Sequence, residues 1–164
     1  MKKENELVDI RILGTSAAEG WPALFCTCEA CVKARKLGGR NLRTRSSLQI
    51  GESLKIDFPP DSLAHARMYN LDFSRLQYIL FTHAHFDHLA PKELTYLIPP
   101  FALQDKTRSI RLYGSAECME LLKDPQKQIE RDRPQLLNEI TFFQHFQLGD
   151  YDIHTLKANH GTKD

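Results

Sequence analysis

Short runs of apolar and polar positions along this chain predict strands and helices in succession. Residues 7–13 alternate apolar with charged side chains, which is the pattern of a half-buried strand. Residues 76–82 are mostly apolar and predict a buried strand. Five further runs have strand character: residues 47–50, 54–58, 110–113, 140–146 and 151–158. The first two and the last two of these runs predict β-hairpins, because turn residues join them.

Helical segments fall between these strands. Residues 29–37 predict a helix that ends at Gly38-Gly39, and Asp61 is placed to cap a helix through about residue 69. Three more helical segments are expected: one opened by Pro91, one capped by Ser115 with Met119, Leu121 and Leu122 facing inward, and an amphipathic one over 129–138 that Pro134 interrupts. Strands that arrive as hairpins with helices between them predict a mixed sheet in an α/β sandwich.

Composition narrows the class of protein. A chain of 164 residues with 41% apolar and 26% charged residues has room for one globular domain, which we expect to span residues 1–164. The 22 Lys and Arg residues nearly balance the 21 Asp and Glu residues, so the net charge gives no reason to expect nucleic acid or an acidic membrane as partner. No run approaches the ~18–20 apolar residues of a membrane span, and residues 2–11 are too charged for a signal peptide. We therefore expect a cytoplasmic protein.

Basic side chains concentrate in one stretch on either side of Gly38-Gly39. They are Arg35, Lys36, Arg40, Arg43 and Arg45. Two interpretations stay open at this point. The stretch is either a solvated loop or a cationic rim that receives an anionic substrate.

The densest chemistry is the segment His83-Ala84-His85-Phe86-Asp87-His88, directly after the buried strand. Imidazole and carboxylate groups together suit zinc, manganese or iron. These four side chains cannot share one face of a helix, where ligands recur at i and i+4, so the segment suits a tight loop. In such a loop His83 and His85 point one way and Asp87 with His88 another, which suits two metals a few ångströms apart. The competing interpretation is a packed histidine cluster without metal.

Three of the four cysteines crowd into Cys26-Thr27-Cys28-Glu29-Ala30-Cys31. In a reducing compartment this spacing favours a metal over disulfides, and a bridge between Cys26 and Cys28 would close a strained loop. Three thiolates leave a tetrahedral zinc one ligand short, so another group must complete the site. Free thiols on a loop are the alternative.

The other candidate ligands are expected to have no part in a metal site. Cys118 falls in a predicted helix and should be a buried apolar residue. His154 is expected at the surface of a strand, and His65 and His145 have no ligand-like neighbours in the sequence.

The motif His-x-His-x-Asp-His at 83–88 is the hallmark of the metallo-β-lactamase fold hydrolases, and this chain resembles that family in the order of its landmarks. A Gly-Thr-Ser loop follows the first strand, a hairpin ending in Leu54-Lys55-Ile56-Asp57 precedes the motif, and Asn159-His160-Gly161 follows a later strand. The resemblance implies an α/β fold of the αββα sandwich type with mixed sheets. It also implies two divalent metals, zinc or manganese, one bound by His83, His85 and His160 and the other by Asp87 and His88.

The N-terminal segment resembles one branch of that family, the PhnP phosphodiesterases and the PqqB proteins. The matching segments are Leu13-Gly14-Thr15-Ser16, Gly20-Trp21-Pro22 and the cysteine cluster. In the phosphodiesterase branch three such thiolates bind a structural zinc that a histidine near the C-terminus completes. The resemblance therefore assigns Cys26, Cys28 and Cys31 to one structural zinc.

The full site of that family needs more ligands than these residues supply. A bridging aspartate and a further histidine normally follow the third histidine, whereas this sequence stops at Asp164, four residues after His160. Asp164 is too close to His160 to be assigned as the bridge, and the histidine that would complete the cysteine site is missing as well. We expect part of a longer protein that lacks much of its second half, or a partner chain that supplies the remainder. Either case predicts exposed apolar surface.

The function that the resemblance implies is hydrolysis of a small cyclic or nucleotide-like phosphodiester by a metal-bound hydroxide, with Asp87 as the catalytic residue that orients it. Two alternatives stay open: a PqqB-like protein of the same fold, and a non-catalytic metal-binding or interaction module. The small-molecule substrate is the expected partner. We expect neither membrane nor nucleic acid, and we allow for a homodimer.

Overall fold

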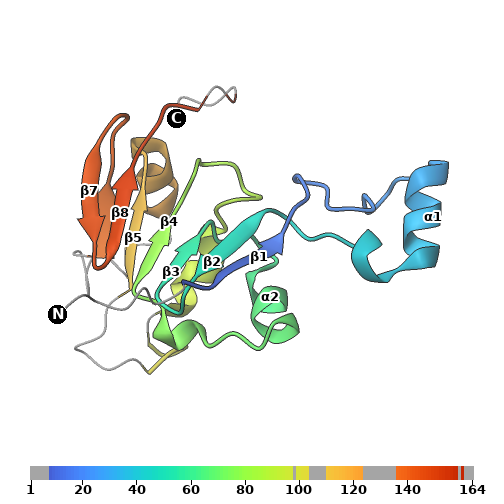
Figure 1. Cartoon of the computed structure of the whole chain (residues 1–164), viewed down its shortest axis with the longest axis horizontal. Coiled ribbons are helices and arrows are strands. Elements are labelled where there is room, and N and C mark those ends of the chain that lie inside the picture. The colour runs from blue at the N-terminus through green and yellow to red at the C-terminus, as the bar shows by residue number, and fades with distance from the viewer. Residues whose placement is uncertain (1–7, 98, 104–109, 124–135, 159, 161–164) are drawn as a thin grey trace.

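Two sheets form the body of the protein, for which the computed structural model describes residues 8–97, 99–103, 110–123, 136–158 and 160. The strands are β1 (Ile10–Gly14), β2 (Ser47–Ile50), β3 (Leu54–Ile56), β4 (Tyr78–Leu80), β5 (Arg111–Gly114), β6 (Leu137–Glu139), β7 (His145–Leu148) and β8 (Tyr151–His154). A six-stranded sheet has the order β1-β2-β3-β4-β5-β6, and β7 pairs with β8 in a two-stranded sheet (Figure 1). The strands from β1 to β3 pair antiparallel and those from β3 to β6 parallel, which confirms the mixed α/β fold. Both predicted hairpins form, although the strands of the second are β7 and β8 rather than residues 140–146 and 151–158.

Helices connect the strands much as the sequence predicts. The helical segments are α1 (Glu29–Leu37), η1 (Gly39–Asn41), α2 (Ser62–Met68), η2 (Phe73–Arg75), α3 (Pro91–Leu94), η3 (Thr95–Leu97) and residues 116–123. The Ser115 hydroxyl accepts a hydrogen bond from the Cys118 N–H at 3.3 Å, which confirms the predicted cap. The predicted side-chain cap at Asp61 is wrong, because that carboxylate pairs with Arg45 instead. Among the helices described, none has the length and apolar character that crossing a membrane requires.

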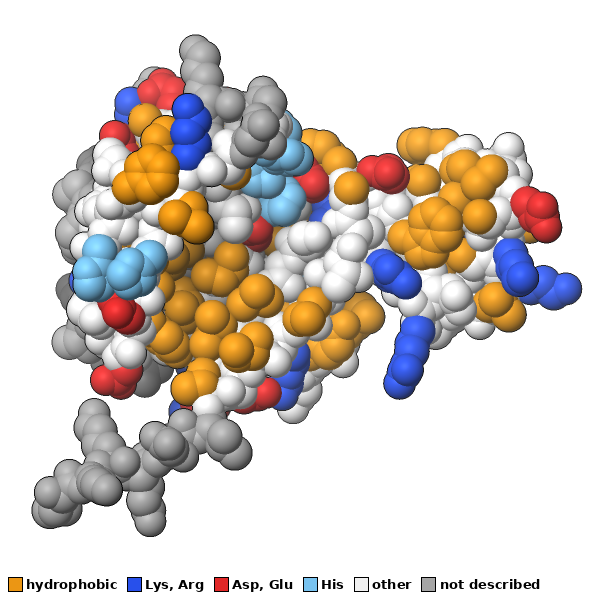
Figure 2. All heavy atoms as spheres, turned by 45° about the horizontal axis from the view of Figure 1, so that its top comes forward, with side chains coloured by type: hydrophobic (Ala, Val, Ile, Leu, Met, Phe, Trp, Pro, Cys, Tyr) orange, Lys and Arg blue, Asp and Glu red, His pale blue; other side chains and the backbone are white. Residues whose placement is uncertain are grey.

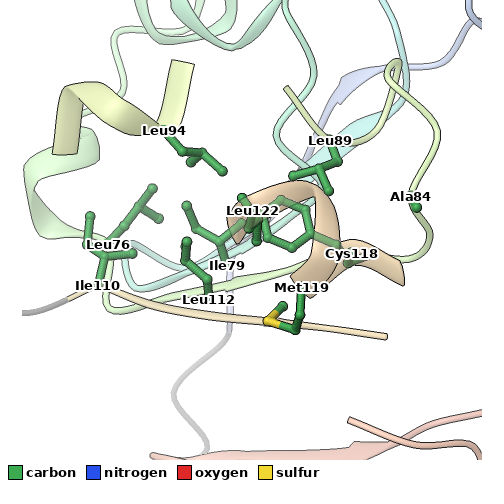
Figure 3. Packing of buried hydrophobic residues seen from close by; sticks show 11 residues of the cluster. Leu76, Ile79, Ala84, Leu89, Leu94, Ile110, Leu112, Cys118, Met119 and Leu122 are labelled. Carbon is green, nitrogen blue, oxygen red and sulfur yellow. The ribbon is translucent and has the colours of Figure 1, made fainter. Parts of the chain in front are cut away.

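Side chains of the central strands alternate between two apolar cores, because successive residues of a strand point to opposite faces. Ile79 of β4 and Leu112 of β5 face the helices, where the helix at 116–123 covers them (Figure 3). Tyr78 and Leu80 of β4 face the opposite way and pack against the β7–β8 hairpin. The helix-side core consists of Leu76, Ile79, Phe81, Ala84, Leu89, Leu94, Ile110, Leu112, Cys118, Met119 and Leu122. The end of β4 therefore lies between a helix layer and a second sheet.

Two predictions for the later part of the chain are wrong. Leu121 is 43% exposed, since other side chains of its helix form the inward face. Leu137 and Asn138, predicted as the end of an amphipathic helix over 129–138, instead belong to the parallel strand β6 beside β5. Pairing with the sheet outweighs the local amphipathic pattern there. Residues 124–135 lie outside the described residues.

The large sheet exposes apolar side chains on its hairpin side. Ile10 and Ile12 of β1 are each 62% exposed, although Ile10 pairs with Ile50, which packs into the second core. The sheet residues of that core come from β2 to β5. Figure 2 shows the uncovered surface as a broad orange area between the hairpin and the projecting α1 segment. The predicted exposure of apolar surface is confirmed, whereas β1 is not buried along its apolar face as its alternation predicted.

An arm that carries α1 leaves the end of β1 and returns to the start of β2 (Figure 1). At its base the Thr44 carbonyl accepts hydrogen bonds from the N–H groups of Thr15 and Ser16 at 3.0 and 2.9 Å. Gly14 is required by this approach, because a Cβ there would lie 2.0 Å from the Arg45 carbonyl oxygen. Buried His65 lies with its Nε2 2.7 Å from the Thr44 hydroxyl. Burial lowers the pKa of His65 to about 4, so the imidazole is neutral and holds the base of the arm.

Lys55 is a fully buried lysine in the middle of β3. Its Nζ donates to the Ser47 hydroxyl at 2.6 Å and lies over the rings of Phe58 and Phe73. Burial lowers the pKa of Lys55 to about 7, and the attraction of Asp57 offsets only part of this effect. The folded protein therefore binds this proton less tightly than the unfolded chain does.

Replacing Lys55 with Met should make stability less dependent on pH. Between the folded pKa of about 7 and the unfolded value of about 10.4, the unfolded chain holds more protons, so the wild-type free energy of unfolding should rise with pH. We expect Lys55→Met to be more stable than wild type by on the order of 1–3 kcal/mol near neutral pH, and the difference to shrink towards the unfolded pKa. Urea unfolding of both proteins across this pH range measures the difference in their free energies of unfolding. Exposed Lys92→Met is the control, and a Lys55→Met difference that does not change with pH would contradict the account.

Candidate metal centre

The ligand loop follows β4 directly and is pinned to the segment after β3. The N–H groups of His88 and Leu89 both donate to the His85 carbonyl at 2.9 Å, which closes a tight turn. The Phe58 N–H donates to the His88 carbonyl at 2.8 Å, and the Ala90 N–H donates to the Phe58 carbonyl at 2.9 Å. The predicted tight loop after a buried strand is therefore confirmed.

Three histidines converge at this loop. Donor atoms of His83, His85 and His160 all lie within 4.8 Å of one another. The Nε2 of His83 and the Nδ1 of His85 are 3.2 Å apart, close to the ~3.3 Å between two ligands of a tetrahedral zinc with bonds of about 2.0–2.1 Å. The ring centroid of His160 lies 4.5 Å from that of His83 and 5.1 Å from that of His85. The three imidazoles therefore fit a divalent ion. Asn159 and Gly161 lie outside the described residues.

Asp87 and His88 lie beside this trio and face each other. The Nε2 of His88 is 3.5 Å from the Oδ2 of Asp87, and the ring centroids of His88 and His83 are 4.1 Å apart. Asp87 is buried, so its carboxylate lies within the centre rather than in solvent. An imidazole and a carboxylate at this spacing suit a second divalent ion next to the first. All five predicted ligand side chains thus meet in one place.

Asp57 organises the imidazoles, although sequence analysis predicted for it no role beyond marking the end of a hairpin. Its carboxylate accepts hydrogen bonds from the His88 Nδ1–H at 2.6 Å, from the Thr82 N–H at 2.8 Å and from the Thr82 hydroxyl at 2.9 and 3.0 Å. That hydroxyl has one hydrogen, so when it donates to Asp57 it accepts from the Nδ1–H of His83, 3.0 Å away. The Nε2 of His83 then faces His85, the Nε2 of His88 faces Asp87, and each can offer its lone pair to a metal ion.

Burial and hydrogen bonding shift the pKa values of His83 and His88 in opposite directions. Burial lowers the pKa of His83, and the nearby imidazoles of His88, His160 and His85 lower it further. The hydrogen bond to Asp57 raises the pKa of His88 against the effect of burial. His83 is therefore neutral and available as a ligand, while His88 keeps a proton on its Nδ1 and donates it in a hydrogen bond to Asp57.

A second group of candidate ligands lies on the arm, where the thiols of Cys26, Cys28 and Cys31 are within 4.8 Å of one another. Cys28 is the N-cap of α1, and hydrogen bonds from the Cys31 N–H and from the thiols of Cys26 and Cys31 lower its pKa. Burial raises the pKa of Cys31. The Arg35 guanidinium holds the loop by donating to the carbonyls of Ala23 and Cys26. Three converging sulfurs fit zinc, which takes a fourth ligand.

Two members of the basic stretch have structural partners. Arg35 binds the cysteine loop, and Arg45 pairs with Asp61 at 3.3 Å and donates to the Ala18 carbonyl at 2.8 Å. The Arg45 guanidinium also lies over the ring of Phe86, 5.6 Å from its centroid, and so packs against the ligand loop. The charge of Arg45 is therefore balanced, and a cationic rim stays a prediction for the rest of the stretch.

The fold is similar to those of longer solved proteins. A diphosphatase from the PhnP family aligns with a TM-score of 0.66 and 18% identity, over 90% of this chain and 56% of that one. Zinc-bound PqqB from Methylobacterium extorquens aligns with a TM-score of 0.65 and 19% identity, over 86% of this chain and 52% of that one. At these identities the likeness is one of fold. This chain spans just over half the length of either protein.

Sequence comparison adds a relative and a family. An octanoyltransferase of Porphyromonas gingivalis is 27% identical over 160 residues, a match that covers 92% of this chain and 30% of that protein. The family profile described as "Beta-lactamase superfamily domain" matches residues 55–164, which contain the whole ligand loop and His160. The fold, the histidine motif and the matched length agree, and the chain belongs to the β-lactamase superfamily.

Proposed function

We propose that this protein is a metal-dependent hydrolase of the phosphodiesterase type, acting on small cyclic or nucleotide-like phosphodiesters. The superfamily is in general one of metal-dependent hydrolases. The observation that carries the proposal is the convergence of three imidazoles beside Asp87 and His88. The fold shared with a diphosphatase of the PhnP family supports phosphate chemistry at this centre.

In this proposal the five candidate ligands divide into two sets. His83, His85 and His160 would hold one ion, and Asp87 with His88 the other. With two divalent ions bound, such a centre lowers the pKa of a water molecule and stabilises charge on phosphate oxygens. The buried carboxylate of Asp87 would also accept a hydrogen bond from the attacking water and hold it in line with phosphorus.

Asp57 would act as a positioning residue for both sets. It fixes His88 directly and His83 through the Thr82 hydroxyl, so that each ring keeps its Nδ1 proton and offers Nε2. Partners of this kind set the tautomer and the orientation of metal-binding histidines and raise their basicity. The centre would then need no rearrangement of these rings when an ion binds.

For the arm we propose one structural zinc on Cys26, Cys28 and Cys31. The clustering of the thiols and the lowered pKa of Cys28 support this assignment, because zinc binds thiolates. α1 and η1 have few apolar contacts of their own, since only Cys31 and Ala34 of α1 are buried. A bound ion would supply the stability that such a small element lacks.

Two other functions stay possible for this fold, a PqqB-like role and a non-catalytic metal-binding module, and the experiments below distinguish them from hydrolysis. The likeness to PqqB is as close in fold as that to the diphosphatase, with TM-scores of 0.65 and 0.66, so a PqqB-like role is the alternative. The octanoyltransferase match covers only 30% of that protein, so its activity is not carried over to this chain. A non-catalytic metal-binding module is the third candidate.

Replacing Asp57 with Asn should weaken metal binding without unfolding the protein. Asn tolerates the left-handed backbone at this position, where φ is 58°, but it lacks the charge that holds the Nδ1–H of His88. We expect the metal affinity of the centre to fall by about 10–100-fold, as measured by isothermal titration with Zn²⁺ or Mn²⁺. Exposed Asp9→Asn is the control, and unchanged affinity in Asp57→Asn would remove its positioning role.

The purified protein should hydrolyse bis-p-nitrophenyl phosphate and a 2′,3′-cyclic nucleotide when loaded with manganese or zinc. We expect Asp87→Asn to lower kcat by about 10²–10⁴-fold, because the attacking water loses its carboxylate acceptor. Exposed Asp150→Asn should leave the rate unchanged. No turnover by a metal-loaded protein would exclude the phosphodiesterase function, and full activity in His85→Ala would exclude this ligand assignment.

Replacing Cys28 with Ser should remove one zinc per chain and loosen the arm. The matched control is Cys118→Ala, which removes a thiol from the helix-side core and should leave the zinc content unchanged. Metal content by mass spectrometry and proteolysis of the arm measure the two effects. Equal zinc content in Cys28→Ser and wild type would show that the thiols hold no ion.

A further inference from the structure

The outer face of the β7–β8 hairpin carries a set of metal-binding side chains that the proposed hydrolase does not use. Cross-strand pairs place His145 opposite His154 and Gln147 opposite Asp152. Because side chains alternate along a strand, these four residues share one face. The alternate residues, Phe146, Leu148, Tyr151 and Ile153, pack into the second core. The polar set is therefore held on the exposed side by a hairpin whose register the core fixes.

The donor atoms of this set converge on one point. The rings of His145 and His154 stack with centroids 4.1 Å apart and planes within 9° of parallel. The Nε2 of His145 contacts the Oδ1 of Asp152, and the Nε2 of His154 is 3.5 Å from its Oδ2. One donor atom from each of the three residues lies within 4.8 Å of the others. The sequence prediction that His145 has no ligand-like neighbour is wrong, since its neighbours come from the paired strand.

The electrostatics of the set favour a cation. The Asp152 carboxylate faces both imidazoles: it contacts the Nε2 of His145 and lies 3.5 Å from the Nε2 of His154. Gln147 donates its side-chain N–H to the Oδ1 of Asp152 at 3.1 Å and helps to fix the carboxylate. Two protonated imidazoles stacked face to face would repel each other, whereas one divalent ion can be shared by both rings and the carboxylate.

The geometry needs only a small adjustment to bind such an ion. Ligands of a tetrahedral zinc stand ~3.3 Å apart. The Nε2 of His154 already lies 3.5 Å from the Oδ2 of Asp152, and the closer contact between His145 and Asp152 has only to open slightly. All three side chains are exposed, and exposed side chains change rotamer easily. A surface ion pair with a stacked aromatic pair is the plain alternative, and such contacts add little to the stability of a hairpin.

We propose that His145, Asp152 and His154 form a third, exchangeable binding site for a divalent transition-metal ion of the zinc class, with solvent completing its coordination. Two imidazoles and one carboxylate are a ligand set that such ions take readily. The site is separate from the centre at His83: Figure 2 shows a histidine group on the hairpin, beside an acidic side chain, apart from the larger histidine group at the top. It is independent of the proposed hydrolysis.

Zinc titration followed by ¹⁵N-histidine NMR tests the site in the full chain. The protein is first loaded with enough zinc to saturate the histidine centre and the cysteine cluster. Further Zn²⁺ is then titrated without any other ligand. We expect the ring signals of His145 and His154 to shift together with one further equivalent. His154→Gln should abolish this uptake, and Asp152→Asn should weaken it by about tenfold or more.

Exposed Asp150→Asn is the matched control and should bind the further equivalent like wild type. The backbone amide signals of Phe146 and Ile153 report whether the hairpin keeps its register in each variant. Ring signals that do not move at millimolar Zn²⁺ would overturn the proposal. So would unchanged uptake of the further equivalent by His154→Gln.

Discussion

The hydrogen bonds that converge on the Asp57 carboxylate join two parts of the chain on which the candidate metal centre depends. Asp57 directly follows β3 in a left-handed conformation, while Thr82 and His88 belong to the loop after β4. Since β3 and β4 are parallel neighbours, both ends reach the same edge of the sheet. The carboxylate there accepts bonds from the backbone, from a hydroxyl and from an imidazole, and so it is buried without being left unsatisfied.

The layers on either side of β4 explain why this edge is rigid. Ile79 is fully buried beneath the helices, and Tyr78 and Leu80 are buried beneath the hairpin, so the strand cannot shift its register without exposing one core. The ligand loop therefore begins at a residue whose position is fixed by this packing. Further bonds between Phe58 and both His88 and Ala90 hold its far end. Rings held in this way can meet an ion without a large loss of conformational freedom.

Local features of the sequence predicted the local structure well. The bounds of α1, both hairpins, the Ser115 cap and the tight ligand loop follow from periodicity, turn residues and ligand spacing. Contacts between segments that are distant in the sequence could not be predicted from such local patterns. Asp57 lies 31 positions before His88, and nothing near it in the sequence marks it as a partner. β6 takes its structure from the sheet edge, and buried Lys55 takes its role from Ser47 on a neighbouring strand.

The central claim is that the histidine centre is built to hold metal, with its rings already oriented by Asp57. Anomalous diffraction at the zinc absorption edge, from crystals of the zinc-loaded protein, tests this most directly. We expect an anomalous peak within bonding distance of His83, His85 and His160, with the Nδ1–H of His88 still hydrogen-bonded to Asp57. A well-occupied crystal with no peak at these imidazoles, or with His88 turned away from Asp57, would contradict it.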